Sequence, residues 1–161
     1  MNMKDKSDEL LHKEITDQIL KAFYKVYNTL GYGFLEKVYE SALAIELRQM
    51  GLQVDRQVPL KVYYGQHLVG EYFADLVVEN KVILELKATE TIVQANVNQL
   101  QNYLKAAEIE VGMLLNLAIS LSSSEEYSVI VGRRRTIFDP RKSAYLRYPR
   151  SIKRSNGEAN G

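Results

Sequence analysis

Three ionisable side chains interrupt two apolar runs within residues 73–88 of this 161-residue chain. Asp75 lies in the first run, and Glu85 and Lys87 lie in the second. Side chains alternate along a strand, so Glu85 and Lys87 share one face. Two carboxylates and an ammonium on an apolar strand pair cost free energy unless they pair with one another or hold a metal ion. These residues are therefore the first candidates for chemistry.

The length of the loop between the two runs decides whether the carboxylates meet. If a three-residue loop, 79–81, joins the strands, Asp75 lies directly opposite Glu85. A two-residue loop would instead set Asp75 opposite Leu86, on the other face. Asn80 can adopt the left-handed conformation that a three-residue hairpin loop requires. We therefore expect an odd loop length, with the three ionisable side chains converging on one face.

Such a cluster has a definite chemical use. A divalent cation between two carboxylates removes their repulsion and leaves coordination positions for water and a phosphate oxygen. A lysine two residues along can hold the attacking water or stabilise developing negative charge. This is the chemistry of a metal-dependent phosphodiester hydrolase. The alternative is a surface ion pair in which Glu85 and Lys87 face solvent, because short D…ExK patterns also arise by chance.

Two predicted helices add polar side chains. Glu36 has the helical spacing of Tyr39 and the apolar residues after it, on a face expected to meet the core, where a metal ion or Lys87 would be its partner. Alternatively, the helix dipole favours a glutamate in a first turn. Gln99 and Tyr103 lie four residues apart at the edge of an apolar helix face. Both could hydrogen-bond a phosphate, a base or Lys87, or they could form an ordinary amphipathic border.

Composition narrows the choice of cofactor. The chain has no cysteine and only two histidines, His12 and His67. Disulfides and thiolate zinc sites are therefore excluded, and a histidine zinc site is not expected. Oxygen ligands favour magnesium or manganese. The N-terminus is polar and no run is long enough to span a bilayer, so we expect a cytoplasmic protein without membrane association.

Hydrophobic periodicity predicts the elements that position these residues. Helices are expected at about 8–30, 35–50 and 92–107, and strands at 53–64, 67–78, 82–87, 111–117 and 127–138. This order indicates an α/β fold with a mixed (α+β) sheet, in which an antiparallel meander is joined by a helical crossover to a further strand.

We expect one domain over residues 1–139 and a basic, flexible tail over residues 140–161. An arginine run at 133–135 precedes that tail. The arginine run and the tail could bind the phosphates of a nucleic acid, with tyrosines of the tail stacking on its bases. Alternatively, they could form a solvent-exposed tail without a binding role. The net charge of +1 neither favours nor excludes a nucleic-acid partner. Tyr63, Tyr64 and Tyr72 are expected to pack within strands.

An ordered set of short motifs resembles the bacterial GxxExxY family, which is grouped with the PD-(D/E)xK nuclease superfamily. Residues 33–39 (GFLEKVY) match the family signature, and the likeness covers roughly residues 10–120. The other matching pieces are 57–64 (QVPLKVYY), 74–75 (AD), 85–87 (ELK), 99–104 (QLQNYL) and 112–116 (GMLLN). The superfamily's proline is absent before Asp75, where Phe73 and Ala74 stand, but that position is variable in such proteins.

The resemblance implies a restriction-endonuclease-like αβββαβ core with an extra N-terminal helix. It also implies a metal-dependent nuclease that hydrolyses phosphodiester bonds, with DNA favoured over RNA. Magnesium or manganese would be held by Asp75, Glu85 and the carbonyl of Leu86, and Lys87 would be the catalytic lysine.

The resemblance also assigns roles to the helix-borne residues. Glu36 would be a further metal ligand or would pin Lys87, and Gln99 with Tyr103 would support the site. A catalytically silent nucleic-acid-binding or protein-interaction module on the same fold is the alternative, and a subunit active only with a partner is a third reading. A homodimer would suit a cut through both strands of a duplex.

Overall fold

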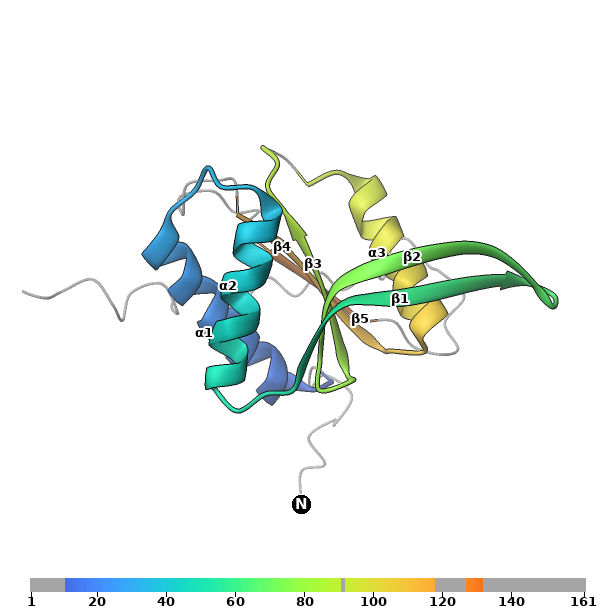
Figure 1. Ribbon diagram of the computed structural model, residues 1–161, viewed down its shortest axis with the longest axis horizontal. Helices are drawn as coiled ribbons and strands as arrows, with labels where there is room; N and C mark the ends of the chain where they lie inside the picture. The colour runs from blue at the N-terminus through green and yellow to red at the C-terminus, as the bar shows by residue number, and fades with distance from the viewer. Residues whose placement is uncertain (1–10, 91, 118–126, 132–161) are drawn as a thin grey trace, which may run out of the picture.

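The computed structural model describes residues 11–90, 92–117 and 127–131, which form one mixed sheet with helices on both faces (Figure 1). The helices are α1 (Lys13–Leu30), α2 (Glu36–Gln49) and α3 (Gln94–Ala107). The strands are β1 (Val54–Tyr64), β2 (His67–Val78), β3 (Val82–Lys87), β4 (Val111–Asn116) and β5 (Tyr127–Val131). The predicted order of elements is confirmed. The predicted strand end at 132–138, the arginine run and the tail from 140 lie outside the described residues.

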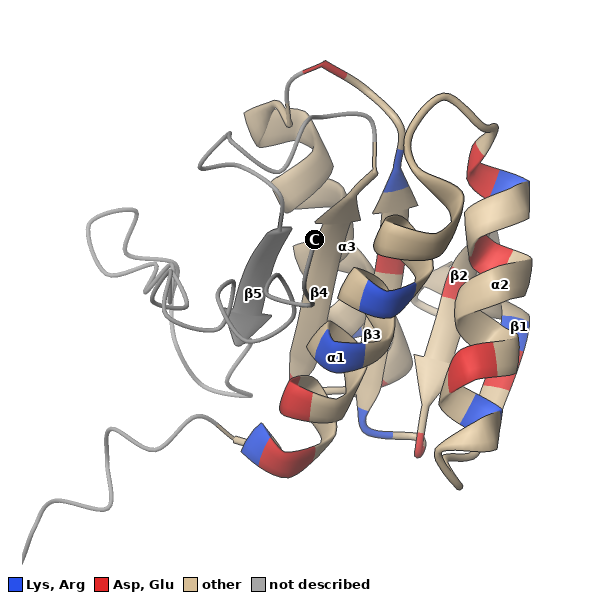
Figure 2. Ribbon diagram, turned by 90° about the vertical axis from the view of Figure 1, so that its left-hand side faces the viewer, with Lys and Arg blue, Asp and Glu red and all other residues tan. Residues whose placement is uncertain are grey.

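The sheet has the strand order β1-β2-β3-β4-β5. Neighbouring strands are antiparallel except β3 and β4, which are parallel and are joined through α3. The predicted meander and helical crossover are therefore confirmed. Acidic and basic residues are interspersed along α1 and α2, the pair of helices on one face (Figure 2). Among the described residues, no helix combines the length and apolar character needed to cross a membrane.

The core lies in two layers, one on each face of the sheet. On one side α1 and α2 pack through residues such as Phe23 and Leu43 against Leu84. On the other side α3 packs through Leu100 against Ile83 and its neighbours. Strand β3 is thus covered on both faces, which explains its nearly unbroken apolar sequence. Because side chains alternate, Glu85 must enter the α3 layer, on the same face as Ile83.

The loop between β2 and β3 has the predicted length. Val78 pairs with Val82, which leaves residues 79–81 as the turn. Glu79 and Asn80 both have a φ of 53°, so the left-handed conformation expected of Asn80 extends to its neighbour as well. If the register of β2 and β3 is continued by one more pair beyond Leu76 and Leu84, Asp75 lies opposite Glu85. The prediction that an odd loop brings these two residues together is confirmed.

The β1–β2 hairpin extends beyond the body of the molecule (Figure 1). Its pairing runs from Arg56–Leu76 to Val58–Ala74 and omits Gln57 and Asp75. Leu76 packs in the α1–α2 layer, whereas Ala74 packs in the α3 layer. The side chains of β2 therefore change from one face of the sheet to the other at the position of Asp75.

Three tyrosines lie in this hairpin. The sequence predicts that Tyr63, Tyr64 and Tyr72 pack within strands. This is wrong for Tyr63 and Tyr64, which are exposed, whereas Tyr72 is exposed on one side and packs its ring against Tyr103 of α3. The end of the hairpin that carries Tyr63 and Tyr64 extends beyond the body of the molecule (Figure 1).

Tyr39 fixes the turn between α1 and α2. It is fully buried, and its hydroxyl donates to the Gly31 carbonyl at 2.7 Å and accepts the Phe34 N–H at 3.3 Å. Gly33 lies between these two groups with a φ of 105°, a value that favours glycine. The tyrosine therefore determines where α2 begins, and with it the position of Glu36.

Tyr39→Phe should lower the free energy of unfolding by about 1–3 kcal/mol. The ring stays in the core, but two backbone groups of the turn lose their partner. Urea unfolding monitored by circular dichroism measures the loss. Tyr32→Phe, on an exposed tyrosine of the same turn, is the matched control. Equal stability of the two variants would contradict this role for the hydroxyl.

Candidate active site

Asp75 and Glu85 join β2 to β3 through their side chains where the regular pairing ends. The Leu86 N–H donates to Asp75 Oδ2 at 2.8 Å, and the Asp75 N–H donates to Glu85 Oε1 at 3.4 Å. Each carboxylate therefore accepts a hydrogen bond from the backbone of the opposite strand. This exchange holds the two carboxylates next to each other.

The environment of this pair disfavours two negative charges. Glu85 is 5% exposed, and burial, followed by the charge of Asp75, raises its pKa to about 8. Burial also raises the pKa of Asp75, against the opposing effect of the hydrogen bond from Leu86. The surface-ion-pair alternative, with Glu85 facing solvent, is therefore wrong. A buried pair of this kind is stabilised by a proton or a cation.

Lys87 ends β3 on the face that carries Glu85. It is partly buried, and its charge lowers the pKa of both Asp75 and Glu85. Within the described part of the chain, no ion pair shorter than 4.0 Å involves its ammonium. The lysine is therefore close enough to act on the carboxylates electrostatically without being bound to either of them.

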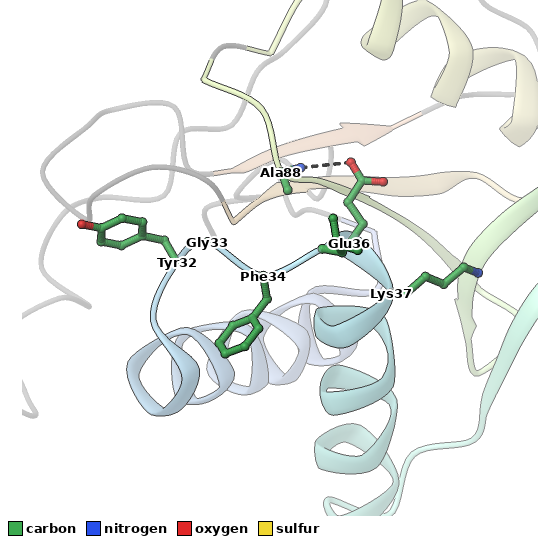
Figure 3. Close-up of a pocket in the computed structure, with 7 residues that line it drawn as sticks. Tyr32, Gly33, Phe34, Glu36, Lys37 and Ala88 are labelled. Carbon is green, nitrogen blue, oxygen red and sulfur yellow. Dashed lines mark hydrogen bonds between the residues drawn. The ribbon is translucent and has the colours of Figure 1, made fainter.

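Glu36 does not point into the core. It is exposed at the first residue of α2, and its Oε1 accepts the Ala88 N–H at 3.1 Å (Figure 3). This contact lies beside a pocket of about 520 Å³ that Phe34 and Lys37 also line, and Figure 3 draws these lining residues. The expectation of an inward glutamate is wrong, and Glu36 instead holds the backbone directly after Lys87.

Asn116 holds the same segment from the other side. Its Nδ2 donates to the Thr89 carbonyl at 2.7 Å, and its Oδ1 accepts the Thr89 N–H at 3.3 Å. Asn116 is buried at the end of β4. Together with Glu36, it fixes the chain that leaves β3 and thereby limits the positions available to Lys87.

Gln99 and Tyr103 come together on α3, as their spacing predicts. Gln99 Nε2 donates to the Tyr103 hydroxyl at 2.8 Å. Burial, followed by the charge of Glu85, raises the pKa of Tyr103, which places this phenol within electrostatic reach of the carboxylate pair. The ring of Tyr72 faces that of Tyr103, with 5.6 Å between centroids. Helix α3 approaches closely because Gly112 of β4 leaves room for Leu100.

Two residues that the sequence analysis did not single out complete the surroundings of Asp75. Glu40 is 2% exposed, and its carboxylate accepts from Arg56 Nε at 3.1 Å and from Gln57 Nε2 at 2.8 Å. Gln57 Nε2 also lies 3.5 Å from Asp75 Oδ1. A signal for Glu40 was present, since it shares the helical spacing of the buried Leu43 and Leu47. Gln57 lies within one of the matched motifs.

The donor set is a pair of carboxylates and not a larger cluster. Across residues 11–90, 92–117 and 127–131, no three His, Cys, Asp or Glu side chains are grouped so that they could hold a metal ion. Glu36 is not grouped with the pair as a third donor, although its charge raises the pKa of both Asp75 and Glu85. Asp75 and Glu85 nevertheless offer only oxygen donors in a buried setting that disfavours their own charge, which fits a hard divalent cation completed by backbone, water or substrate oxygens.

The chain belongs to the PD-(D/E)XK nuclease superfamily. The family model with this description matches residues 13–128, which include all the elements except the end of β5. A search of curated proteins and a search of solved structures each found no significant match. Together with the fold and the carboxylate pair, the match identifies a superfamily whose members are generally nucleases.

In the metal-free protein, Glu85 should make stability fall as the pH rises. Its pKa is 4.5 in the unfolded chain and about 8 in the folded one, so between these values the folded state keeps a proton that the unfolded state has released. The contribution of Glu85 to the free energy of unfolding is therefore fully favourable below about pH 4.5. As the pH rises through about 8, this contribution, which amounts to several kcal/mol, is lost.

Urea unfolding in EDTA, from about pH 5 to about pH 9, measures this slope. Glu85→Gln should flatten it and should be more stable than the wild type at the alkaline end. Glu71→Gln, on an exposed glutamate of β2, should leave the slope unchanged. A wild-type slope that survives Glu85→Gln would show that another group causes it.

Proposed function

We propose that this protein is a metal-dependent nuclease that hydrolyses phosphodiester bonds of nucleic acid, DNA in preference to RNA. The observation that carries the proposal is the carboxylate pair, with Glu85 buried and Asp75 partly buried, and a lysine on the same face. Asp75 and Glu85 exchange hydrogen bonds across two strands, and Lys87 follows Glu85 on β3 without a direct ion pair among the described residues.

Asp75, Glu85 and the Leu86 carbonyl would hold the cation, with magnesium or manganese expected from the oxygen donors. When bound, the cation would neutralise charge on the phosphate and make water a better nucleophile. Because the pKa of Glu85 is about 8 without a cation, proton and cation compete for this residue. Cation binding should therefore strengthen as the pH rises toward that value.

The remaining residues would act on the substrate directly or hold the site in place. Water adds to phosphorus and loses a proton, while the bond to the leaving sugar oxygen breaks and that oxygen gains a proton. Lys87 would donate a hydrogen bond to the attacking water or to a phosphate oxygen. Gln99 and Tyr103 would support this arrangement from α3, and Glu36 would keep the segment after Lys87 in place.

We further propose the narrower assignment to the GxxExxY family. The structure gives its signature a physical reason, because Gly33 and Tyr39 form the turn and Glu36 binds the chain after Lys87. A bacterial origin, a cytoplasmic location and a homodimer are further expectations. The bacterial origin rests on the resemblance, the cytoplasmic location on the polar N-terminus and the lack of a long apolar run, and the homodimer on the need to cut two strands of a duplex.

The test is cleavage of labelled single-stranded DNA, duplex DNA and RNA in magnesium, manganese or EDTA. Asp75→Asn, Glu85→Gln and Lys87→Met should each lower metal-dependent cleavage by roughly 100-fold or more. Each has a matched control on an exposed residue nearby, namely Asp55→Asn, Glu71→Gln and Lys81→Met. The controls should cut at the wild-type rate.

Full activity of folded Asp75→Asn, or cleavage that persists in EDTA, would sink the nuclease proposal. If the wild type cuts none of the substrates, fluorescence anisotropy with the same nucleic acids gives the next answer. Binding that survives both EDTA and Lys87→Met would then favour the catalytically silent module over the enzyme.

A further inference from the structure

Gln57 has a backbone conformation that a glutamine in a strand does not normally adopt. Its φ is 49°, and the pairing of β1 with β2 omits this residue and Asp75 opposite it. A non-glycine residue in the left-handed region is strained, and such strain is often found at functional sites. The position therefore calls for a compensating interaction.

The Gln57 side chain supplies that interaction, because it lies between two carboxylates. Its Nε2 is 2.8 Å from Glu40 Oε2 and 3.5 Å from Asp75 Oδ1. Ionised carboxylates only accept hydrogen bonds, so the amide nitrogen, with its two N–H groups, must be the atom that faces both. The amide thus separates two negative groups and donates to each.

Glu40 anchors the amide from α2. It is almost completely buried, and Arg56 Nε at 3.1 Å and Lys37 Nζ at 3.3 Å balance its charge. The remaining oxygen of Asp75 accepts the Leu86 N–H. Both oxygens of Asp75 are therefore held, one from β3 and one from Gln57, and the carboxylate has a fixed orientation.

The strained backbone is what directs this amide toward α2. Arg56 and Gln57 are consecutive, yet both contact Glu40. In a regular strand their side chains would point to opposite faces. The positive φ of Gln57 interrupts this alternation and re-aims its side chain. Relieving the strain would therefore remove the amide from Asp75.

We propose that Gln57, anchored by Glu40, is a positioning residue that orients the Asp75 carboxylate for cation binding. The inference rests on the proposed function, since it assumes that Asp75 is a metal ligand. Partners that orient metal ligands typically change metal affinity by 10- to 100-fold when they are removed. Gln57 itself need not touch the cation or the substrate.

Two substitutions separate this role from a purely structural one. Gln57→Leu keeps the side-chain volume but has no N–H to donate. Gln57→Gly also lacks the amide but adopts a φ of 49° without strain. If the residue only shapes the strand, Gln57→Gly should bind metal like the wild type. If it positions Asp75, both variants should lose affinity.

The readout is Mn²⁺ binding to the full chain by isothermal titration calorimetry, with the urea unfolding midpoint confirming that each variant is folded. We expect both variants to bind Mn²⁺ roughly 10- to 100-fold more weakly than the wild type. Gln53→Leu, on an exposed glutamine just before the same strand, should bind normally. Wild-type affinity in either Gln57 variant would overturn the inference. If Gln57→Leu does not fold, Gln57→Gly still decides.

Asp75→Asn in the same titration distinguishes failure of the positioning role of Gln57 from failure of the proposed metal site. If it abolishes Mn²⁺ binding while the Gln57 variants bind like the wild type, the positioning role fails and the metal site stands. If the wild type binds no Mn²⁺, or Asp75→Asn changes nothing, the metal site fails and the positioning role fails with it.

Discussion

The structure depends on an interruption of hydrogen bonding along β2. Asp75 lies where the regular pairing to β1 is omitted and the regular pairing to β3 ends. A strand in the middle of a sheet cannot leave backbone groups unpaired without a loss of free energy. Here side chains replace the missing backbone partners, since Glu85 accepts the Asp75 N–H and Asp75 accepts the Leu86 N–H. The two carboxylates thus take the place of backbone hydrogen-bond acceptors where the regular pairing is interrupted.

The rest of the domain can be understood as support for that interruption. Helix α2 contributes Glu36 to the segment after β3 and Glu40 to the Gln57 amide. Strand β4 contributes Asn116, and α3 brings Tyr103 against the same region. The buried negative charges are opposed by Arg56 and Lys37 on one side and by Lys87 on the other. Such an arrangement reduces stability locally, and strain of this kind is common at functional sites.

Sequence reasoning reached the elements and the central site because both depend on short-range regularities. The parity of the 79–81 loop followed from strand alternation and from Asn80, and it correctly joined Asp75 to Glu85. Glu36 was misplaced because a helical face is poorly defined at the first residue of a helix. Glu40 and Gln57 were missed for another reason. The sequence does not indicate that a glutamine will adopt a positive φ. Two partners of the buried Glu40, namely Arg56 and Gln57, lie on β1 and are not adjacent to it in the sequence.

The bend at Gln57 also matters for the outer side of β1. This strand forms one edge of the described sheet, and an edge strand of its length presents a row of N–H and C=O groups on which another chain could pair. Gln57 departs from the extended conformation, and Pro59, two residues later, has no N–H to offer. A second strand could therefore not run straight along β1. The distortion that shapes the site also protects the sheet against edge-to-edge aggregation.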